Sequence, residues 1–269
     1  MLNMRLLTIV STLLRINLTK TVFYNLRLFP VKLAIHFPIV FYGRCQVLIK
    51  VGGKCLKINT KPRFELLKVG KNQSLTYGIK NSHPEVTYFQ INGALELNGY
   101  NNEFANGCKI YVKKGGRLVL NGNVLLQNRC KIHCADNINI GYYSQFSWET
   151  QLFDTDMHYL VDENGNVKNN KGSIVIGDYC WVGNRCTIQK GTKLPDYMVV
   201  ASNSVVNKDF TNQLYGVIAG VPAQYIKGGQ KRLLDFKMER LLDKYFQENP
   251  SIIRTTLSDI VLIDKNKNI

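Results

Sequence analysis

Acidic side chains are almost missing from the amino-terminal end of this chain, where residues 1–80 hold one, Glu65, against 14 Lys and Arg. Residues 81–269 carry 21 basic and 18 acidic groups, so most of the formal net charge of +16 belongs to the amino-terminal end. Such a bias favours an anionic partner for that end. We expect peripheral contact with an anionic membrane surface rather than nucleic acid, because the cations alternate with aliphatics and prolines and no nucleic-acid-binding motif accompanies them.

Long uncharged apolar runs are missing too. Arg27 and Lys32 interrupt the stretch from Val22 to Tyr42, so no run reaches the roughly 18 residues that a spanning helix needs. Residues 1–15 are rich in aliphatics, yet no small-residue cleavage site follows them, and we expect no signal peptide. The seven Cys, an odd number spread over a long chain, are not typical of a disulfide framework. These absences indicate a cytoplasmic protein, with at most peripheral contact at the inner face of the membrane.

The second half of the chain has an aliphatic residue at every sixth position: Ile176, Val182, Ile188, Leu194, Val200 and Val206. A period of six fits neither a helix nor a lone strand, so it describes short extended segments separated by turns. Three segments form one turn of a coil, and stacked turns bury the aliphatics that a single turn leaves exposed. Earlier aliphatics at 120–132 and at 140–152 keep the same spacing in two phases offset by two positions. The pattern predicts an all-β coil over residues 85–213.

The remaining segments differ in kind. Residues 1–49 form a basic, aliphatic amino-terminal segment, and residues 50–228 form the coil domain, beginning with less regular strands at 50–84. Residues 158–173 are polar and rich in Asn and Gly, so we expect them to leave the coil as an exposed loop. The last part, 229–269, contains an amphipathic helix at 229–247 and a tail after Pro250.

Four stretches resemble the hexapeptide-repeat acyltransferases, and most closely the sugar and polysaccharide O-acetyltransferases. These stretches are Ile140-Gly-Tyr-Tyr-Ser144, Asp154-Thr-Asp-Met-His158, residues 174–183, and residues 199–223, which end in Ala219-Gly-Val-Pro-Ala223. Together they span residues 105–228. The resemblance implies a left-handed parallel β-helix, a homotrimer with sites between adjacent coils, acetyl-coenzyme A as co-substrate, a sugar or lipid-linked glycan as acceptor, and no metal.

The resemblance assigns the catalytic base to His158, at the head of the expected loop. Transfer of an acyl group to a hydroxyl needs a base within hydrogen-bond reach, roughly 3 Å, because an alcohol is a poor nucleophile until its proton is removed. Neutral imidazole, with an ordinary pKa of about 6.5, accepts that proton near neutral pH. Asp154 and Asp156 are candidates for orienting His158 or holding acceptor hydroxyls. Trp148 is a candidate wall of the acceptor cleft, since an aromatic face suits a sugar ring.

Donor-side residues follow from the same resemblance. Trp181 and Gly183 match positions along the pantetheine groove, and Asn184, Ala201 and Asn207 match positions near the coenzyme. Its phosphates would meet Lys208 or Lys227. Gln224 stands where one sugar acetyltransferase subgroup has a basic residue, and Lys227 is our substitute for that cation.

Other interpretations of the same residues stay open. His158 falls six positions after Leu152 and would plug the interior if the coil continued. Asp154 and Asp156 would then cap a turn, and Trp181 would be a packed aromatic. At the level of function, the alternatives are a non-catalytic β-helix scaffold or trimerisation module and a metal-dependent hydratase of the same architecture. The hydratase needs three histidines on neighbouring coils, whereas the repeat region holds His133 and His158.

Overall fold

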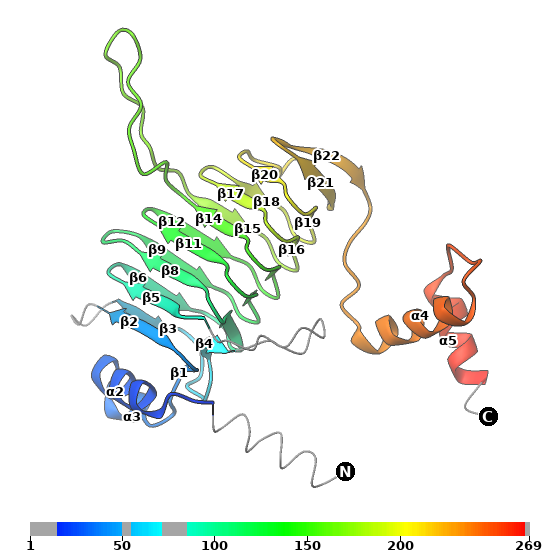
Figure 1. Cartoon of the computed structure of the whole chain (residues 1–269), viewed down its shortest axis with the longest axis horizontal. Coiled ribbons are helices and arrows are strands. Elements are labelled where there is room, and N and C mark those ends of the chain that lie inside the picture. Colours follow the sequence, from blue (N-terminus) through cyan, green and yellow to red (C-terminus); the bar gives the residue numbers. More distant parts are fainter. Residues whose placement is uncertain (1–14, 50–54, 72–84, 267–269) are drawn as a thin grey trace. The chain divides into compact units, whose positions relative to one another are not determined.

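A computed structural model describes residues 15–49, 55–71 and 85–266. The chain divides into two compact units, residues 1–231 and residues 232–269. The first contains the coil, and the second contains α4 (Phe236–Glu248) and α5 (Leu257–Asn266) (Figure 1). Among the described residues, no helix is long and apolar enough to cross a membrane.

The coil has three faces, each a sheet whose strands come from successive turns. Face 1 consists of β1 (Ile39–Phe41), β4 (Leu67–Lys71), β7 (Asn102–Ala105), β10 (Leu125–Leu126), β13 (Gln145–Phe146), β16 (Trp181–Val182), β19 (Val199–Val200), β21 (Gly216–Gly220) and β22 (Ala223–Gly228). Face 2 consists of β2 (Cys45–Ile49), β5 (Thr87–Ile91), β8 (Lys109–Val112), β11 (Lys131–Cys134), β14 (Gln151–Phe153), β17 (Thr187–Gln189) and β20 (Val205–Val206). Face 3 consists of β3 (Leu56–Ile58), β6 (Ala94–Leu97), β9 (Arg117–Leu120), β12 (Asn137–Ile140), β15 (Ile174–Ile176) and β18 (Lys193–Leu194).

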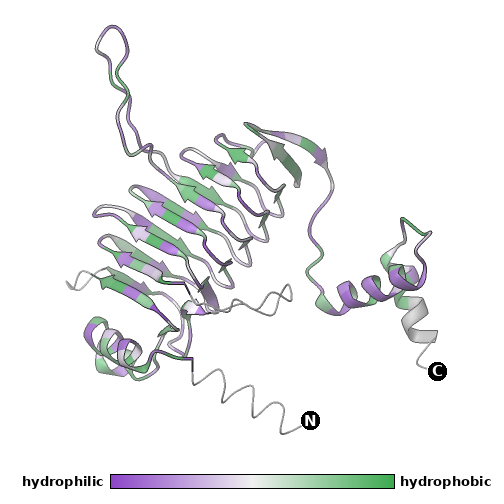
Figure 2. Cartoon of the chain, in the orientation of Figure 1, coloured by the Kyte–Doolittle hydropathy of each residue, from purple (hydrophilic) through white to green (hydrophobic). Residues whose placement is uncertain are grey.

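The described strands pair in parallel except for β21 and β22, which form an antiparallel pair at one end of face 1. The fold is a left-handed parallel β-helix of hexapeptide repeats, as predicted. The six aliphatics of the repeat are buried and stack in register: Ile176 pairs with Leu194, Val182 with Val200, and Ile188 with Val206. Figure 2 shows hydrophobic and hydrophilic residues alternating along the strands, because one side of each strand faces the interior and the other faces solvent.

The two phases of the repeat have a structural cause. Ile176 pairs with Leu194, so this turn of the coil consists of three repeats of six. Leu120 pairs with Ile140, so the earlier turn is longer by two positions. The additional positions belong to the longer strands of face 3, where β12 buries both Ile138 and Ile140. A strand with two inward side chains shifts every later aliphatic by two positions.

Residues 39–49, expected in a separate amino-terminal segment, belong to the coil. Strand β1 pairs with β4, and β2 pairs with β5. Two helices precede and flank this end: α2 (Leu18–Leu28), and α3 (Val31–Ala34), which begins directly after Pro30. All three residues of β1 are buried, because α2 packs against this strand. The first strands carry no six-residue signal, so their sequence alone did not separate them from the segment before.

Two further predicted segments are the irregular strands at 50–84 and the carboxy-terminal helix. Strands β3 and β4 lie in the region expected to be irregular, of which residues 50–54 and 72–84 lie outside the described residues. The carboxy-terminal helix begins later than expected: Asp235 caps α4, where its side chain accepts from the backbone N–H groups of Lys237 and Met238 at 2.9 and 3.1 Å. The tail contains a second helix, α5, which the sequence did not predict.

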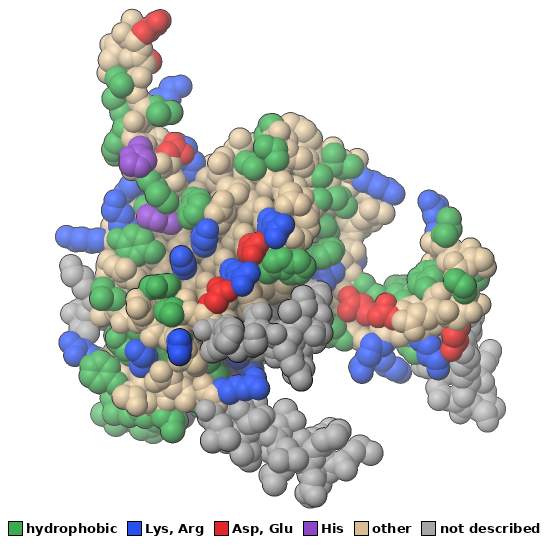
Figure 3. All heavy atoms as spheres, viewed as in Figure 1, with side chains coloured by type: hydrophobic (Ala, Val, Ile, Leu, Met, Phe, Trp, Pro, Cys, Tyr) green, Lys and Arg blue, Asp and Glu red, His purple; other side chains and the backbone are tan. Residues whose placement is uncertain are grey.

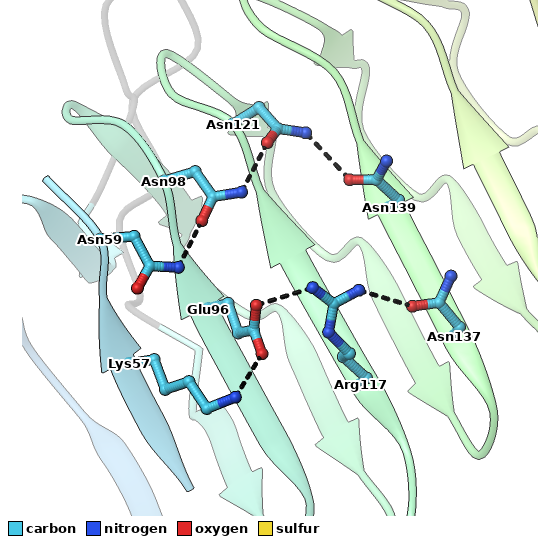
Figure 4. Close-up of polar contacts among 8 residues, drawn as sticks. All are labelled: Lys57, Asn59, Glu96, Asn98, Arg117, Asn121, Asn137 and Asn139. Carbon is cyan, nitrogen blue, oxygen red and sulfur yellow. Dashed lines mark hydrogen bonds and ion pairs between the residues drawn. The ribbon is translucent and has the colours of Figure 1, made fainter. Parts of the chain in front are cut away.

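An asparagine ladder reinforces the stacking on face 3 (Figure 4). Asn59 donates to Asn98 at 2.8 Å, Asn98 donates to Asn121 at 2.9 Å, and Asn121 donates to Asn139 at 2.9 Å. An amide side chain can both donate and accept, so equivalent positions of neighbouring turns are linked side chain to side chain as well as through the backbone.

Beside this ladder, Glu96 bridges two cations. It lies 2.9 Å from Lys57 Nζ and 2.7 Å from Arg117 Nη2, whose other amino group donates to Asn137 at 3.3 Å (Figure 4). The hydrogen bond from Arg117, followed by that from Lys57, lowers the pKa of Glu96 to about 2. The carboxylate therefore ties turns together in its charged form.

Candidate functional site

The long loop leaves the coil between β14 and β15, at the corner where face 2 turns into face 3 (Figure 1). At its stem, the backbone N–H of Asp156 donates to the carbonyl of Asn170 at 2.8 Å. At its tip, the Asp162 side chain accepts from the backbone N–H of Asn166 at 2.8 Å. Hydrogen bonds at both ends hold the loop as a narrow ribbon, which the sequence predicted as an exposed loop.

His158 lies at this stem with its side chain exposed to solvent. Its backbone N–H donates to the carbonyl of Asp156 at 2.7 Å, and its carbonyl accepts from Asn170 Nδ2 at 3.4 Å. The preceding residue, Met157, has a φ of 63°, a left-handed conformation that turns the chain sharply before the histidine. His158 therefore does not plug the coil interior, and its backbone is fixed while its ring stays accessible. A general base needs both properties.

Asp154 and Asp156 occupy different environments. Asp154 is fully buried, and its carboxylate accepts from the backbone N–H groups of Ala135 and Asp136 at 2.7 and 2.8 Å. Burial raises the pKa of Asp154, and these two amides offset part of the increase. Both oxygens thus serve the turn between β11 and β12, which is the turn-capping role that the sequence left open. Asp156 is exposed at the loop stem.

Lys190 completes the stem and was not among the residues predicted from sequence. Its ammonium lies 2.5 Å from Asp156 Oδ2 and donates to the carbonyl of Asn169 at 3.3 Å. It therefore holds both arms of the loop from the next turn of the coil. Lys190 follows β17 at the same corner from which the loop emerges. A lysine next to a turn glycine, Gly191, carries no distinctive sequence signal.

Several predicted residues lie on face 1 or at the corner between faces 1 and 2: Trp148, Trp181, Gly183, Asn184 and Ala201. The indoles of Trp148 and Trp181 are partly exposed, and Trp181 Nε1 lies 3.4 Å from Ser147 Oγ. Asn184 Oδ1 accepts from Ser202 Oγ at 2.6 Å. At Gly183, a Cβ would come within 2.6 Å of the Ser202 backbone nitrogen, so the close approach of two turns requires glycine here.

Two coenzyme-binding candidates lie nearer to the loop. Asn207 and Lys208 follow β20 at the corner between faces 2 and 3, the corner from which the loop emerges. Lys208 Nζ donates to Gln224 Oε1 at 2.8 Å, so the glutamine found in place of a basic residue contacts a lysine. Lys227 is exposed in β22, the last strand of face 1.

The predicted residues therefore form two groups on one chain. His158, Asp156, Asn207 and Lys208 share the corner between faces 2 and 3, with Lys190 beside them. The two tryptophans, Asn184 and Ala201 lie on face 1 or at its corner with face 2. A single coil presents these groups to solvent on different corners.

The histidine and cysteine groups do not form a metal site in the part of the chain that is described. His133 lies in β11 between the rings of Tyr111 and Phe153, and burial lowers its pKa. No group of three or more His, Cys, Asp or Glu in the described ranges is arranged to hold a metal ion. Cys180 and Cys186 are buried as free thiols whose sulfurs lie 3.2 and 3.1 Å from backbone carbonyls. They pack in the interior, as their repeat position predicts.

No family model matches the chain. The chain is 32% identical over 179 residues to an uncharacterized 24.8 kDa protein in the cps region of Klebsiella pneumoniae, an alignment that covers 63% of this chain and 78% of that relative. The chain belongs to the same family as this cps-region protein. The three-sided coil, the six-residue register of its aliphatics and the histidine-bearing loop agree with the resemblance to the hexapeptide-repeat acyltransferases.

A second relative matches over a shorter stretch. A probable macrolide acetyltransferase of Lysinibacillus sphaericus is 40% identical over 72 residues, which are 27% of this chain and 37% of that relative. Among solved structures, the polysialic acid O-acetyltransferase OatWY is 21% identical, with coverage of 76% of this chain and 100% of that chain and a TM-score of 0.45.

Proposed function

We propose that this acyltransferase moves an acetyl group from acetyl-coenzyme A to a hydroxyl of a sugar or cell-surface polysaccharide precursor, with His158 as the general base. The proposal rests on one observation above the others: His158 is the exposed imidazole of a loop whose stem is fixed by hydrogen bonds and an ion pair. The relatives with acetyltransferase names and the cps-region relative support the acyl group and the acceptor class.

In the proposed reaction, the His158 imidazole accepts the proton of the acceptor hydroxyl as the oxygen attacks the thioester carbonyl. The tetrahedral intermediate collapses with cleavage of the carbon–sulfur bond, and the coenzyme A thiolate takes the proton back from the imidazolium. Acetyl ester and free thiol are the products, and no covalent enzyme intermediate is needed. Asp156 and Lys190 orient the loop, while Asp154 holds the turn beneath it.

We propose that the enzyme works as a homotrimer. The loop corner carries His158 and Lys208, whereas Trp181 and Asn184 lie on face 1 or at its other corner. A neighbouring copy that packs its face 1 against this corner would complete the donor groove. In this groove Trp181 and Gly183 line the pantetheine arm, Asn184, Ala201 and Asn207 lie near the coenzyme, and Lys208 or Lys227 meets its phosphates. Trp148 lines the acceptor side. The buried free thiols support a reducing compartment, and we place the reaction in the cytoplasm.

The test measures thiol release and acetyl-ester formation with acetyl-coenzyme A and a panel of bacterial capsular oligosaccharides. We expect His158→Ala to lower the rate by at least about a hundredfold, with donor binding and the thermal unfolding midpoint retained because the ring is exposed. His36→Ala, at another exposed histidine, is the matched control. Donor binding is measured separately by calorimetry. A wild-type protein that forms trimers but binds no coenzyme A would favour the scaffold alternative.

A further inference from the structure

Helix α2 packs on the coil with two polar residues on its inward side, beside the partly buried Tyr24 and Leu28. Thr21 and Asn25 are its buried residues. Asn25 donates to the carbonyl of Ile39 at 2.6 Å and accepts from its N–H at 3.2 Å, while Thr21 Oγ1 accepts from the N–H of Phe41 at 3.1 Å. These side chains satisfy backbone groups of β1, which ends face 1 and would otherwise present an open strand edge. The helix therefore needs its polar residues on the inside.

The opposite side of the helix is consequently apolar and exposed. Leu18, Val22 and Leu26 follow one another at four-residue spacing and are 67%, 40% and 54% exposed. Helices on soluble domains show the reverse arrangement, with the apolar stripe inward. We call this surface the α2 face, and it comprises the exposed apolar residues of α2 and of the segment after it: Leu18, Val22, Phe23, Leu26, Val31 and Ile35. Figure 3 shows hydrophobic side chains gathered at the end of the coil where Figure 1 draws α2 and α3.

Basic residues accompany the α2 face and acidic ones do not. Arg15, Arg27 and Lys32 are exposed on the same segment. Residues 1–64 contain no Asp or Glu, and the first acidic residue, Glu65, is hydrogen-bonded to Tyr42. An apolar ridge with only cations around it matches the chemistry of an anionic bilayer surface, where apolar side chains enter the acyl boundary and cations meet phosphate.

We propose that the α2 face docks the protein on an anionic lipid bilayer, lying in the interface without crossing it. The charge of this segment favours a lipid bilayer over a second copy of the chain as the partner of the α2 face. A second copy of the chain would bring one basic rim against another, and like charges across an interface oppose association. Docking through α2 is independent of acyl transfer and would hold the catalytic domain at a surface where lipid-linked acceptors reside.

The experiment is vesicle flotation of the full chain. The vesicles contain phosphatidylcholine alone or phosphatidylcholine mixed with phosphatidylglycerol, at low and high salt. We expect the protein to float with the anionic vesicles and to remain at the bottom with the neutral ones, with weaker binding at high salt. The triple variant Leu18→Ser, Val22→Ser, Leu26→Ser should lower partitioning by at least about tenfold, because the apolar contact is lost. The triple variant Arg15→Gln, Arg27→Gln, Lys32→Gln should lower it by about fivefold for each charge removed.

The matched control replaces three exposed apolar residues near the other end of the coil, as Leu214→Ser, Val221→Ser, Ile226→Ser, and should float like the wild type. Circular dichroism melts of all variants establish that the coil is intact. Failure of the wild type to float with anionic vesicles would overturn the proposal. So would unchanged flotation of the α2 serine variant, which would assign binding to another segment. Self-association that the serine substitutions abolish, without any vesicle binding, would identify the face as a contact between copies and would also overturn it.

Discussion

The ammonium of Lys190 lies 2.5 Å from the carboxylate of Asp156, which precedes His158 by two positions in the chain. The pair joins the loop stem to the turn of the coil that follows it, since Lys190 also donates to the carbonyl of Asn169 on the other arm of the loop. Both side chains are partly exposed, so the pair adds little to the stability of the fold. Its effect is on where the loop, and with it His158, is held.

Replacement of Lys190 with Met should therefore lower acetyl transfer without unfolding the coil. We expect a loss of about ten- to a hundredfold in kcat, because a small displacement of a catalytic group is costly, and an unchanged thermal midpoint. Amide hydrogen exchange should increase in the loop stem. Lys168→Met, on an exposed lysine of the same loop, is the matched control. Full activity of Lys190→Met would mean that the stem hydrogen bonds alone position His158.

Asp154→Ala should destabilise the fold, so its effect should not be limited to the acyl-transfer reaction. The substitution leaves two buried backbone N–H groups, of Ala135 and Asp136, without their acceptor, which destabilises the fold by about 2–4 kcal/mol. We expect a thermal midpoint several degrees lower. Asp156→Ala, at an exposed position, should leave the midpoint unchanged, and equal midpoints for the two variants would contradict the structural role of Asp154.

Gly183→Ala separates packing from donor binding. A Cβ at this position would overlap the backbone of Ser202 in the next turn, so the turns must move apart, at about 1–3 kcal/mol. Thermal unfolding should show the loss directly. If the midpoint is unchanged and only KM for acetyl-coenzyme A rises, Gly183 serves the pantetheine groove and the coil accommodates the methyl group.

Glu96 should make the coil sensitive to acid. Its folded pKa of about 2 lies below its ordinary value of 4.5. A carboxylate whose pKa is lower in the folded state than in the unfolded state stabilises the fold fully when the pH is above its unfolded pKa. This stabilisation is lost as the pH falls from about 4.5 toward 2. Because Lys57 and Arg117 are half exposed, we expect Glu96→Gln to reduce stability by about 1–2 kcal/mol at pH 7. Denaturant unfolding at pH 7 and pH 2.5 should show this difference shrinking in acid, and a constant difference would exclude the linkage.

The sequence by itself determined the coil and the loop that leaves it. Each repeat must bury one aliphatic residue, as Ile176, Val182 and Ile188 do. Because this requirement recurs at a fixed spacing, it can be recognised in the sequence alone. His158 was named from the resemblance, which implies a catalytic base at the head of the loop that interrupts this period. The predicted handedness, the proposed trimer and the proposed donor residues rest on the resemblance rather than on spacing.

Tertiary structure decided which residues meet across turns. Lys190 and Asp156 are separated in the chain by the whole loop and three strands, β15, β16 and β17. Asp154 reaches back to Ala135, and no local pattern encodes either contact. The orientation of α2 was hidden for the same reason: Thr21 and Asn25 look like an outer polar side until β1 supplies the backbone groups that they bind. Side chains of this kind take their roles from partners that only the stacking of the turns brings near.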